Sequence, residues 1–105
     1  MTFEGTQKKS IKEIRDAVKK ETYDFILDVF NREGFAFESI DSLKVFLKKA
    51  RDGDSFKEYT DSFILEKLSV IAEELKSKIE DEAHGLDRVI LSKFAGSINL
   101  IKERL

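Results

Sequence analysis

Residues 60–83 read TDSFILEKLSVIAEELKSKIEDEA, and this stretch predicts the fold of the chain. Its apolar side chains recur at steps of one, three and four, so they lie along one side of an α-helix. These side chains are Phe63, Ile64, Leu68, Ile71, Leu75 and Ile79. The opposite side carries charged residues, namely Glu66, Glu73, Lys76 and Glu80. A helix of this length cannot bury such a stripe alone, so we expect other segments to cover it.

A first helix is predicted to begin at Ser10 and to end just before Gly34. Ser10 and Glu13 form a capping box, in which the Ser10 hydroxyl accepts a hydrogen bond from the Glu13 amide. Gly34 ends the helix because glycine adopts the left-handed conformation of a helix C-terminus without strain. Phe30 and Phe35 are then expected to make the hydrophobic contact of a Schellman motif. The apolar stripe of this helix is Ile11, Ile14, Val18, Thr22, Phe25 and Val29.

A short second helix is predicted after a connector over residues 35–40. Either Ser39 or Asp41 caps its N-terminus, and the helix runs to about Arg51, where Gly53 follows. Its apolar face consists of Ile40, Leu43, Phe46, Leu47 and Ala50. Because this helix is only ~16 Å long, we expect it to close one end of a bundle or to cross the long helices obliquely.

The sequence leaves both ends of the third helix open. Ser55 begins a second capping box, SFKE, so the helix starts there or at Thr60. Gly85 marks its end, and Asp87 is expected to cap a fourth helix. If the helix instead passes through Gly85, residues 55–105 form one rod of ~75 Å, which only pairing with another chain would stabilise.

The fourth helix carries an apolar face that is wider than a coiled-coil seam, which indicates contact with more than one neighbour. The members of this face are Leu86, Val89, Ile90, Phe94, Ile98, Ile101 and Leu105. Gly96 lies inside this helix and costs ~1 kcal/mol relative to alanine. We expect another helix to approach closely at Gly96, with a functional hinge as the alternative.

Length and composition agree with a single all-α domain. The 105 residues fit one domain, with residues 1–9 as a flexible N-terminal arm and residues 10–105 as the helical bundle. Proline is absent, and no stretch alternates apolar and polar residues between turn signals, so a sheet is not expected. The predicted fold is an antiparallel helical bundle of three long helices plus one short helix. The wide apolar faces of the first and last helices suit a homodimer as readily as a monomer core.

Composition also excludes several classes of protein. The chain has no cysteine, so it forms neither disulfides nor thiolate metal sites. No apolar run approaches the ~20 residues that span a bilayer, and the N-terminal residues lack the apolar segment of a secretory signal. A cytoplasmic protein without a membrane span is therefore expected. Its net charge of −2 fits neither a bulk polyanion mimic nor an evident nucleic-acid-binding protein.

No arrangement of residues carries a recognisable catalytic or metal-binding motif, so we assign no catalytic residue, no cofactor and no metal ligand. Asp81-x-x-His84 matches half of the Glu-x-x-His pattern of di-iron helical bundles, but the chain has no second histidine to complete the pattern. A carboxylate-based, metal-dependent hydrolase is the least favoured alternative, and it predicts that magnesium, manganese or iron raises the melting temperature. Its residues would be Glu73, Glu74, Glu80, Asp81 and His84.

Basic side chains gather on the short helix and just after it. They are Lys44, Lys48, Lys49, Arg51 and Lys57. Residues 44–57 hold five basic and two acidic side chains, whereas residues 58–87 hold nine acidic and three basic ones. Such a segregated surface can orient a charged partner, although solvated helix faces explain the same pattern without one. The basic edge suits contact with an acidic protein surface or with the phosphates of a nucleic acid.

Two aromatic residues of the connector, Phe35 and Phe37, fall outside the main apolar stripes. Exposed aromatic side chains commonly anchor protein interfaces, so both are candidate partner-binding residues. The alternative is that they plug the open end of the bundle together with Tyr23 and Tyr59.

These observations favour a non-enzymatic protein–protein interaction module, such as a small intracellular inhibitor, adaptor or immunity-type protein. The alternative is a nucleic-acid-associated helical protein that uses the basic edge of the short helix, and its binding would weaken steeply with salt. In size and helical content the chain resembles the small cytosolic bacteriocin immunity proteins. This resemblance concerns the fold alone and assigns the chain to no family.

Overall fold

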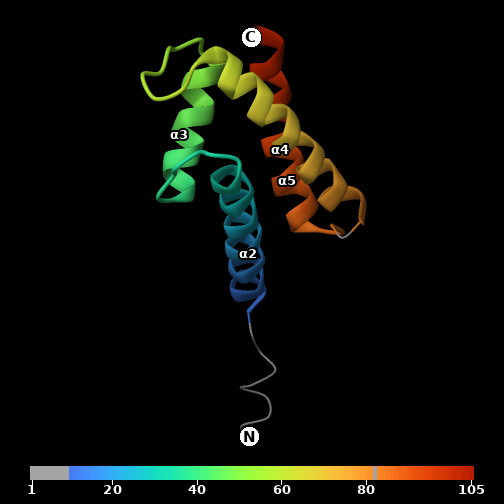
Figure 1. Ribbon diagram of the computed structural model, residues 1–105. Helices are drawn as coiled ribbons and strands as arrows, with labels where there is room; N and C mark the ends of the chain where they lie inside the picture. Colours follow the sequence, from blue (N-terminus) through green and yellow to red (C-terminus); the bar gives the residue numbers. More distant parts are fainter. Residues whose placement is uncertain (1–9, 82) are drawn as a thin grey trace, which may run out of the picture.

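The computed structural model describes residues 10–81 and 83–105, and within them the chain forms four α-helices and no strand. The helices are α2 (Ile11–Arg32), α3 (Ile40–Arg51), α4 (Asp61–Asp81) and α5 (Leu86–Arg104), as Figure 1 shows. Three of them are long and one is short, so the predicted all-α bundle is confirmed. The predicted arm over residues 1–9 lies outside the described residues.

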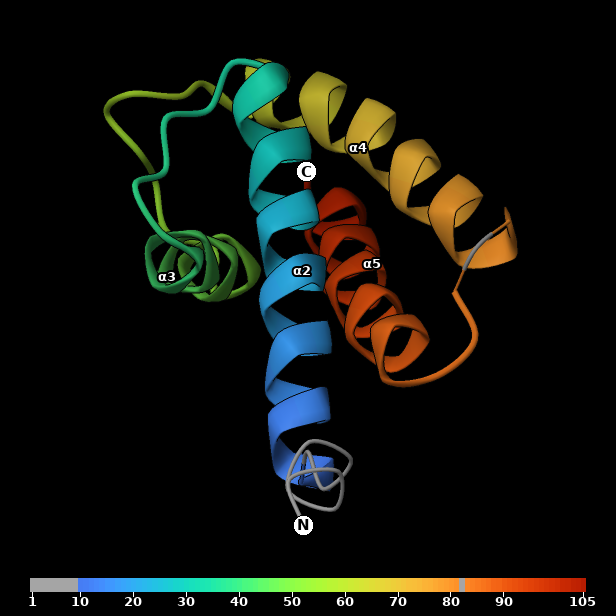
Figure 2. The same cartoon turned by 90° about the horizontal axis from the view of Figure 1, so that it is seen from below.

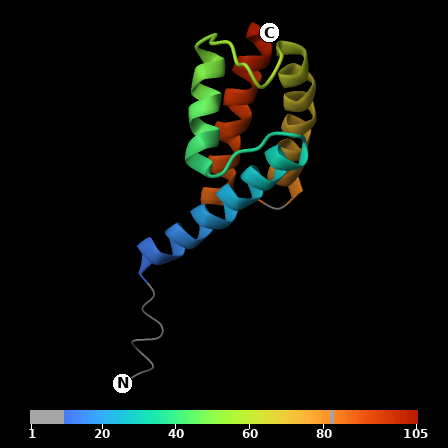
Figure 3. The same ribbon diagram turned by 60° about the vertical axis from the view of Figure 1, so that its left-hand side comes forward.

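Helix α5 occupies the centre of the bundle, because it packs against α2, α3 and α4 (Figure 2). The sequence suggested residues 60–83 as the stretch that organises the fold, but its helical part, Asp61–Asp81, is α4, which flanks α5. Helices α4 and α5 are antiparallel, α3 points in the same direction as α5, and α2 crosses the other helices obliquely (Figure 3). The oblique crossing expected of the short helix therefore belongs to the long α2.

Side-chain caps start three of the helices. The Ser10 hydroxyl accepts from the Glu13 amide at 3.1 Å, and the Ser39 hydroxyl accepts from the Ser42 amide at 3.2 Å, which confirms two predicted caps. The Thr60 hydroxyl caps α4 by accepting a hydrogen bond from the amide of the third helical residue at 3.1 Å. The start proposed at Ser55 is therefore wrong, and its residues lie in the loop before the helix.

Two glycines end α2 and α3 in Schellman turns. Gly34 has a φ of 108°, and the Phe35 amide donates to the Phe30 carbonyl at 3.3 Å. The ring centroids of Phe30 and Phe35 are 5.7 Å apart, which confirms the predicted hydrophobic contact. Gly53 has a φ of 89°, and the amide of Asp54 closes the same turn at the end of α3.

The junction between α4 and α5 differs from the sequence expectation. Helix α4 ends at Asp81, four residues before Gly85, so the continuous rod is excluded. Gly85 is the N-cap of α5 and has a negative φ of −141°. Asp87 lies inside the first turn instead of at the cap, and its Oδ1 accepts from the Gly85 amide at 3.0 Å and from the Arg88 amide at 2.9 Å. The hydrogen bond from Gly85 holds the pKa of the Asp87 carboxyl below its usual range.

The core follows the predicted stripes in the middle of each helix and departs from them near the ends. Ile11 and Ile14 are 75% and 51% exposed, because the first turns of α2 extend past the neighbouring helices. Val89 and Leu105, predicted core residues of α5, are 53% and 44% exposed, whereas Leu91 is 1% exposed. The fully buried large side chains are Ile26, Val29, Phe30, Leu43, Ile64, Leu68, Ile71, Leu75, Leu91, Ile98 and Ile101.

Gly96 does not mark a helix crossing. A Cβ built on Gly96 would meet no atom within 4 Å beyond its own helix, so the expected close approach of another helix is wrong. Gly96 instead lies on the exposed side of α5.

Aromatic rings fill the end of the bundle where the connector meets α3 and α4. The cluster consists of Phe30, Phe35, Phe37, Phe46, Phe56, Tyr59 and Phe63. The Asn31 side chain holds the connector in place, because it accepts from the Phe37 amide at 2.9 Å and donates to the Phe37 carbonyl at 3.0 Å. The connector aromatics therefore fill the end of the bundle together with Tyr59, as the alternative expectation stated. Tyr23 instead packs edge-on against Phe94 of α5.

Candidate partner-binding groove

The basic edge of α3 comes from helical spacing. Lys44, Lys48 and Arg51 lie at positions i, i+4 and i+7 of α3, so they project from the same side. The opposite side of α3 contributes Leu43, Phe46 and Ala50 to the core. Burial of that face is what orients the three cations.

Packing of α3 beside α5 turns this edge into one wall of a groove. The hollow between the two helices has a volume of about 320 Å³. Its lining residues are Lys44, Leu47, Lys48, Arg51, Lys93, Phe94 and Ser97. The floor is apolar, since Leu47 and Phe94 are 4% and 7% exposed and belong to the core. Four of the seven lining residues are basic and none is acidic, so the groove attracts anionic groups.

Weak contacts hold the cations at the rim of the groove. The Lys44 Nζ lies 4.6 Å from the centroid of the Tyr23 ring, and the Arg51 guanidinium donates to the Ser97 hydroxyl at 3.4 Å. The Lys48 Nζ lies 3.9 Å from an Asp52 carboxylate oxygen, and both side chains are more than half exposed. Exposed pairs of this kind contribute only about 0–1 kcal/mol. A carboxylate of a partner can therefore replace these contacts with little loss of free energy.

The structure separates the predicted basic residues into two sets. It brings Lys44, Lys48 and Arg51 together in the groove, whereas Lys49 and Lys57 are exposed and do not line it. Lys49 follows Lys48 by one residue and so points about 100° away around α3. Lys57 lies in the loop between α3 and α4.

Sequence reasoning missed the contribution of α5 to the groove. Lys93 and Ser97 line it opposite α3. The sequence shows that residues 88–105 are rich in basic side chains, but no sequence pattern predicts that Lys93 lies across the groove from Lys48. Only the packing of α3 against α5 does so.

The structure places Phe35 and Phe37 in the aromatic cluster and outside the groove. Phe35 is 3% exposed, and its ring stacks on that of Phe37 with 5.4 Å between centroids. Phe37 is half-buried and packs 5.2 Å from the Phe46 ring. Phe35 is therefore not the exposed anchor that the sequence suggested, because its ring is buried in the aromatic cluster that closes the bundle. The role of Phe37 stays a prediction.

The residues of the hydrolase alternative do not converge. Glu73, Glu80 and Asp81 are exposed on α4, and His84 is exposed in the loop that follows. His84 therefore does not share a helical face with Asp81. The Glu74 carboxylate lies 3.8 Å from the guanidinium of Arg32 on α2. Among residues 10–81 and 83–105, no group of three or more His, Cys, Asp or Glu side chains has a metal-binding arrangement.

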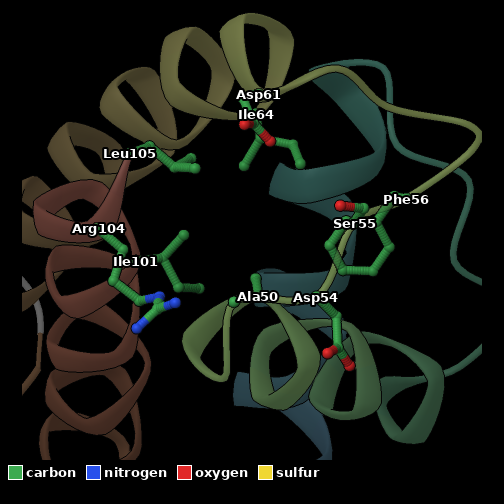
Figure 4. A pocket seen from close by; sticks show the side chains of 10 residues that line it. Ala50, Asp54, Ser55, Phe56, Asp61, Ile64, Ile101, Arg104 and Leu105 are labelled. Atoms are coloured by element: carbon green, nitrogen blue, oxygen red, sulfur yellow. The ribbon is translucent and has the colours of Figure 1, made fainter.

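A second hollow, of about 160 Å³, opens where α3 ends and α4 begins (Figure 4). The Arg104 side chain extends into it from α5, while Asp54 and Asp61 line other parts of its wall. Its single cation is outnumbered by the two acids, so this hollow lacks the uniform charge of the groove. The guanidinium of Arg104 packs against the backbone at Gly53, where a Cβ would collide with it.

No protein family model matches the chain, and neither a curated protein nor a solved structure is significantly similar to it. In the described part of the chain, no helix combines the length and apolar character that crossing a membrane requires.

Proposed function

We propose that this protein is a non-enzymatic binding module, and that the groove between α3 and α5 binds an acidic segment of a protein partner. The observation that carries this proposal is the composition of the groove. Two helices contribute four basic side chains around an apolar floor, without an acid among the lining residues. Charge complementarity of this kind speeds association and selects partners of opposite charge. The absence of a catalytic motif in the sequence supports a binding role.

A protein partner fits the groove better than a nucleic acid does. Phe46 is 5% exposed, so it presents no free face on which a base could stack. Phe56, whose ring centroid lies 4.8 Å from that of Phe46, lines the second hollow and not the groove. The outer face of α4 carries acidic residues, which repel a polyanion at longer range. These residues are Glu66, Glu73 and Glu80.

Nuclear magnetic resonance with the isotopically labelled full chain tests the proposal. A glutamate-rich peptide is the probe, and double-stranded DNA is the comparison. We expect the peptide to shift the amide signals of Lys44, Lys48, Arg51 and Lys93, and to bind more tightly than the DNA does. Tighter binding of DNA would favour the nucleic-acid alternative instead.

Charge reversal supplies the matched control. Lys48→Glu is expected to weaken peptide binding about tenfold, since it replaces an attraction at the groove with a repulsion. Lys76→Glu makes the same change on the exposed side of α4, away from the groove, and is expected to leave binding nearly unchanged. Equal effects of the two variants would show that only net charge matters, which would contradict a specific groove.

A further inference from the structure

The two helices that border the groove differ in the chemistry of their exposed sides. The α3 wall is basic, with Lys44, Lys48 and Arg51 at positions i, i+4 and i+7. On α5, the residues at i, i+4, i+7 and i+11 share one side of the helix. They are Val89, Lys93, Gly96 and Leu100. Of these four, only Lys93 lines the groove, and the other three continue the same exposed side of α5 beyond the lining residues. We call this side of the helix, which is mainly apolar, the α5 wall.

The α5 wall exposes more apolar surface than the bundle requires. Val89 and Leu100 are 53% and 54% exposed, so neither contributes fully to the core. Between them, Gly96 leaves open space outside the helix, because a Cβ there would meet no neighbouring atom within 4 Å. A wall with a gap between two apolar side chains is suited to the ridge of a packed helix.

We infer that the occupant of the groove is an amphipathic α-helix of the protein partner, with acidic residues at i, i+4 and i+7 beside an apolar strip. This inference rests on the function proposed above and specifies the form of the partner segment. The acidic edge faces the cations of α3, and the apolar strip packs on Leu47, Phe94 and Leu100. The α5 wall spans ~16 Å between Val89 and Leu100, which corresponds to about three turns of the bound helix.

The spacing of the cations favours a helix over an extended peptide. Neighbouring positions i and i+4 of a helix lie ~5–6 Å apart, so an acidic helix with the same spacing pairs with each cation of α3 in turn. An extended peptide places the residues of one side ~7 Å apart. Such a peptide gains most of its affinity from main-chain hydrogen bonds to an exposed strand of its binding partner. The described part of the chain is helical and loop structure and offers no such strand.

Three synthetic peptides of equal length test the inference by fluorescence polarisation with the full chain. The first places glutamate at i, i+4 and i+7 beside a leucine strip, the second scrambles the same residues, and the third is polyglutamate. We expect the first peptide to bind at least about tenfold more tightly than the other two. Circular dichroism is expected to show that it gains helicity when the protein is added.

Two substitutions separate the inference from the function on which it rests. Leu100→Ser is expected to weaken the helical peptide several-fold and to leave polyglutamate unchanged, because only the helix contacts the apolar wall. Val70→Ser, at a residue of α4 that is 42% exposed, is the matched control and is expected to change neither. Equal binding of the helical and scrambled peptides, or no effect of Leu100→Ser, would overturn the helical occupant alone. Absence of binding by all three peptides would overturn the proposed function as well.

Discussion

Because α5 is central, we predict that substitutions at Leu91 and Val89 of this helix change the free energy of unfolding by very different amounts. The apolar spacing assigned Val89 to the core and omitted Leu91, but the structure exposes Val89 by 53% and Leu91 by only 1%. Leu91→Ala removes three buried carbon atoms, which lose about 2.4 kcal/mol of transfer free energy at ~0.8 kcal/mol each. The cavity left behind raises the expected loss to about 3–4 kcal/mol.

Val89→Ala is expected to change the free energy of unfolding by less than about 0.5 kcal/mol. It removes two methyl groups that are already half exposed, and alanine has the higher helix propensity, which offsets the small loss.

Urea unfolding followed by far-ultraviolet circular dichroism measures both variants. For a chain of this size, a loss of about 3 kcal/mol corresponds to a decrease of roughly 12 °C in the melting temperature. The wild-type protein is expected to unfold in one cooperative transition, which allows the two losses to be compared directly. Equal losses, or a larger loss for Val89→Ala, would refute the orientation of α5 described above.

Three further substitutions test the helix ends and the surface of α5. Gly96→Ala is expected to stabilise the protein by about 0.5–1 kcal/mol, because the added methyl group meets nothing and alanine favours the helix; a loss of stability in urea unfolding would indicate a hidden contact. Gly53→Ala is expected to cost about 1–3 kcal/mol, since the φ of 89° disfavours a side chain and the methyl group would displace Arg104. An unchanged melting temperature would contradict the turn. Asp87→Ala is expected to cost about 0.5–1 kcal/mol at neutral pH through the lost hydrogen bond to the Gly85 amide. Because the pKa of Asp87 is lowered in the folded state, its contribution is present above about pH 4 and declines as the pH falls further, so wild type and variant should converge in acid-unfolding curves.

The candidate site was only partly predictable. Helical spacing alone aligned Lys44, Lys48 and Arg51 on one edge of α3, because residues at i, i+4 and i+7 always share a side. The same rule could not predict that Lys93 lines the groove as well. Lys93 lies on α5, and only the packing of α5 against α3 brings it to the basic edge. The rule also could not predict that Phe35 is buried, because rings from α2, α3 and α4 meet around it only in the folded chain.

The sequence by itself determined that the chain is helical, where α2 begins and ends, and where α3 ends, and it narrowed the N-cap of α3 to Ser39 or Asp41. The Ser10 cap, the Ser39 cap and the turn at Gly34 form between residues at most five positions apart, so local chemistry suffices to predict them. The tertiary structure alone decided that α5 is central, that Val89 is exposed while Leu91 is buried, and that α3 and α5 enclose one groove. The physical reason is that burial depends on which helices become neighbours, and residues far apart in the chain make that choice together.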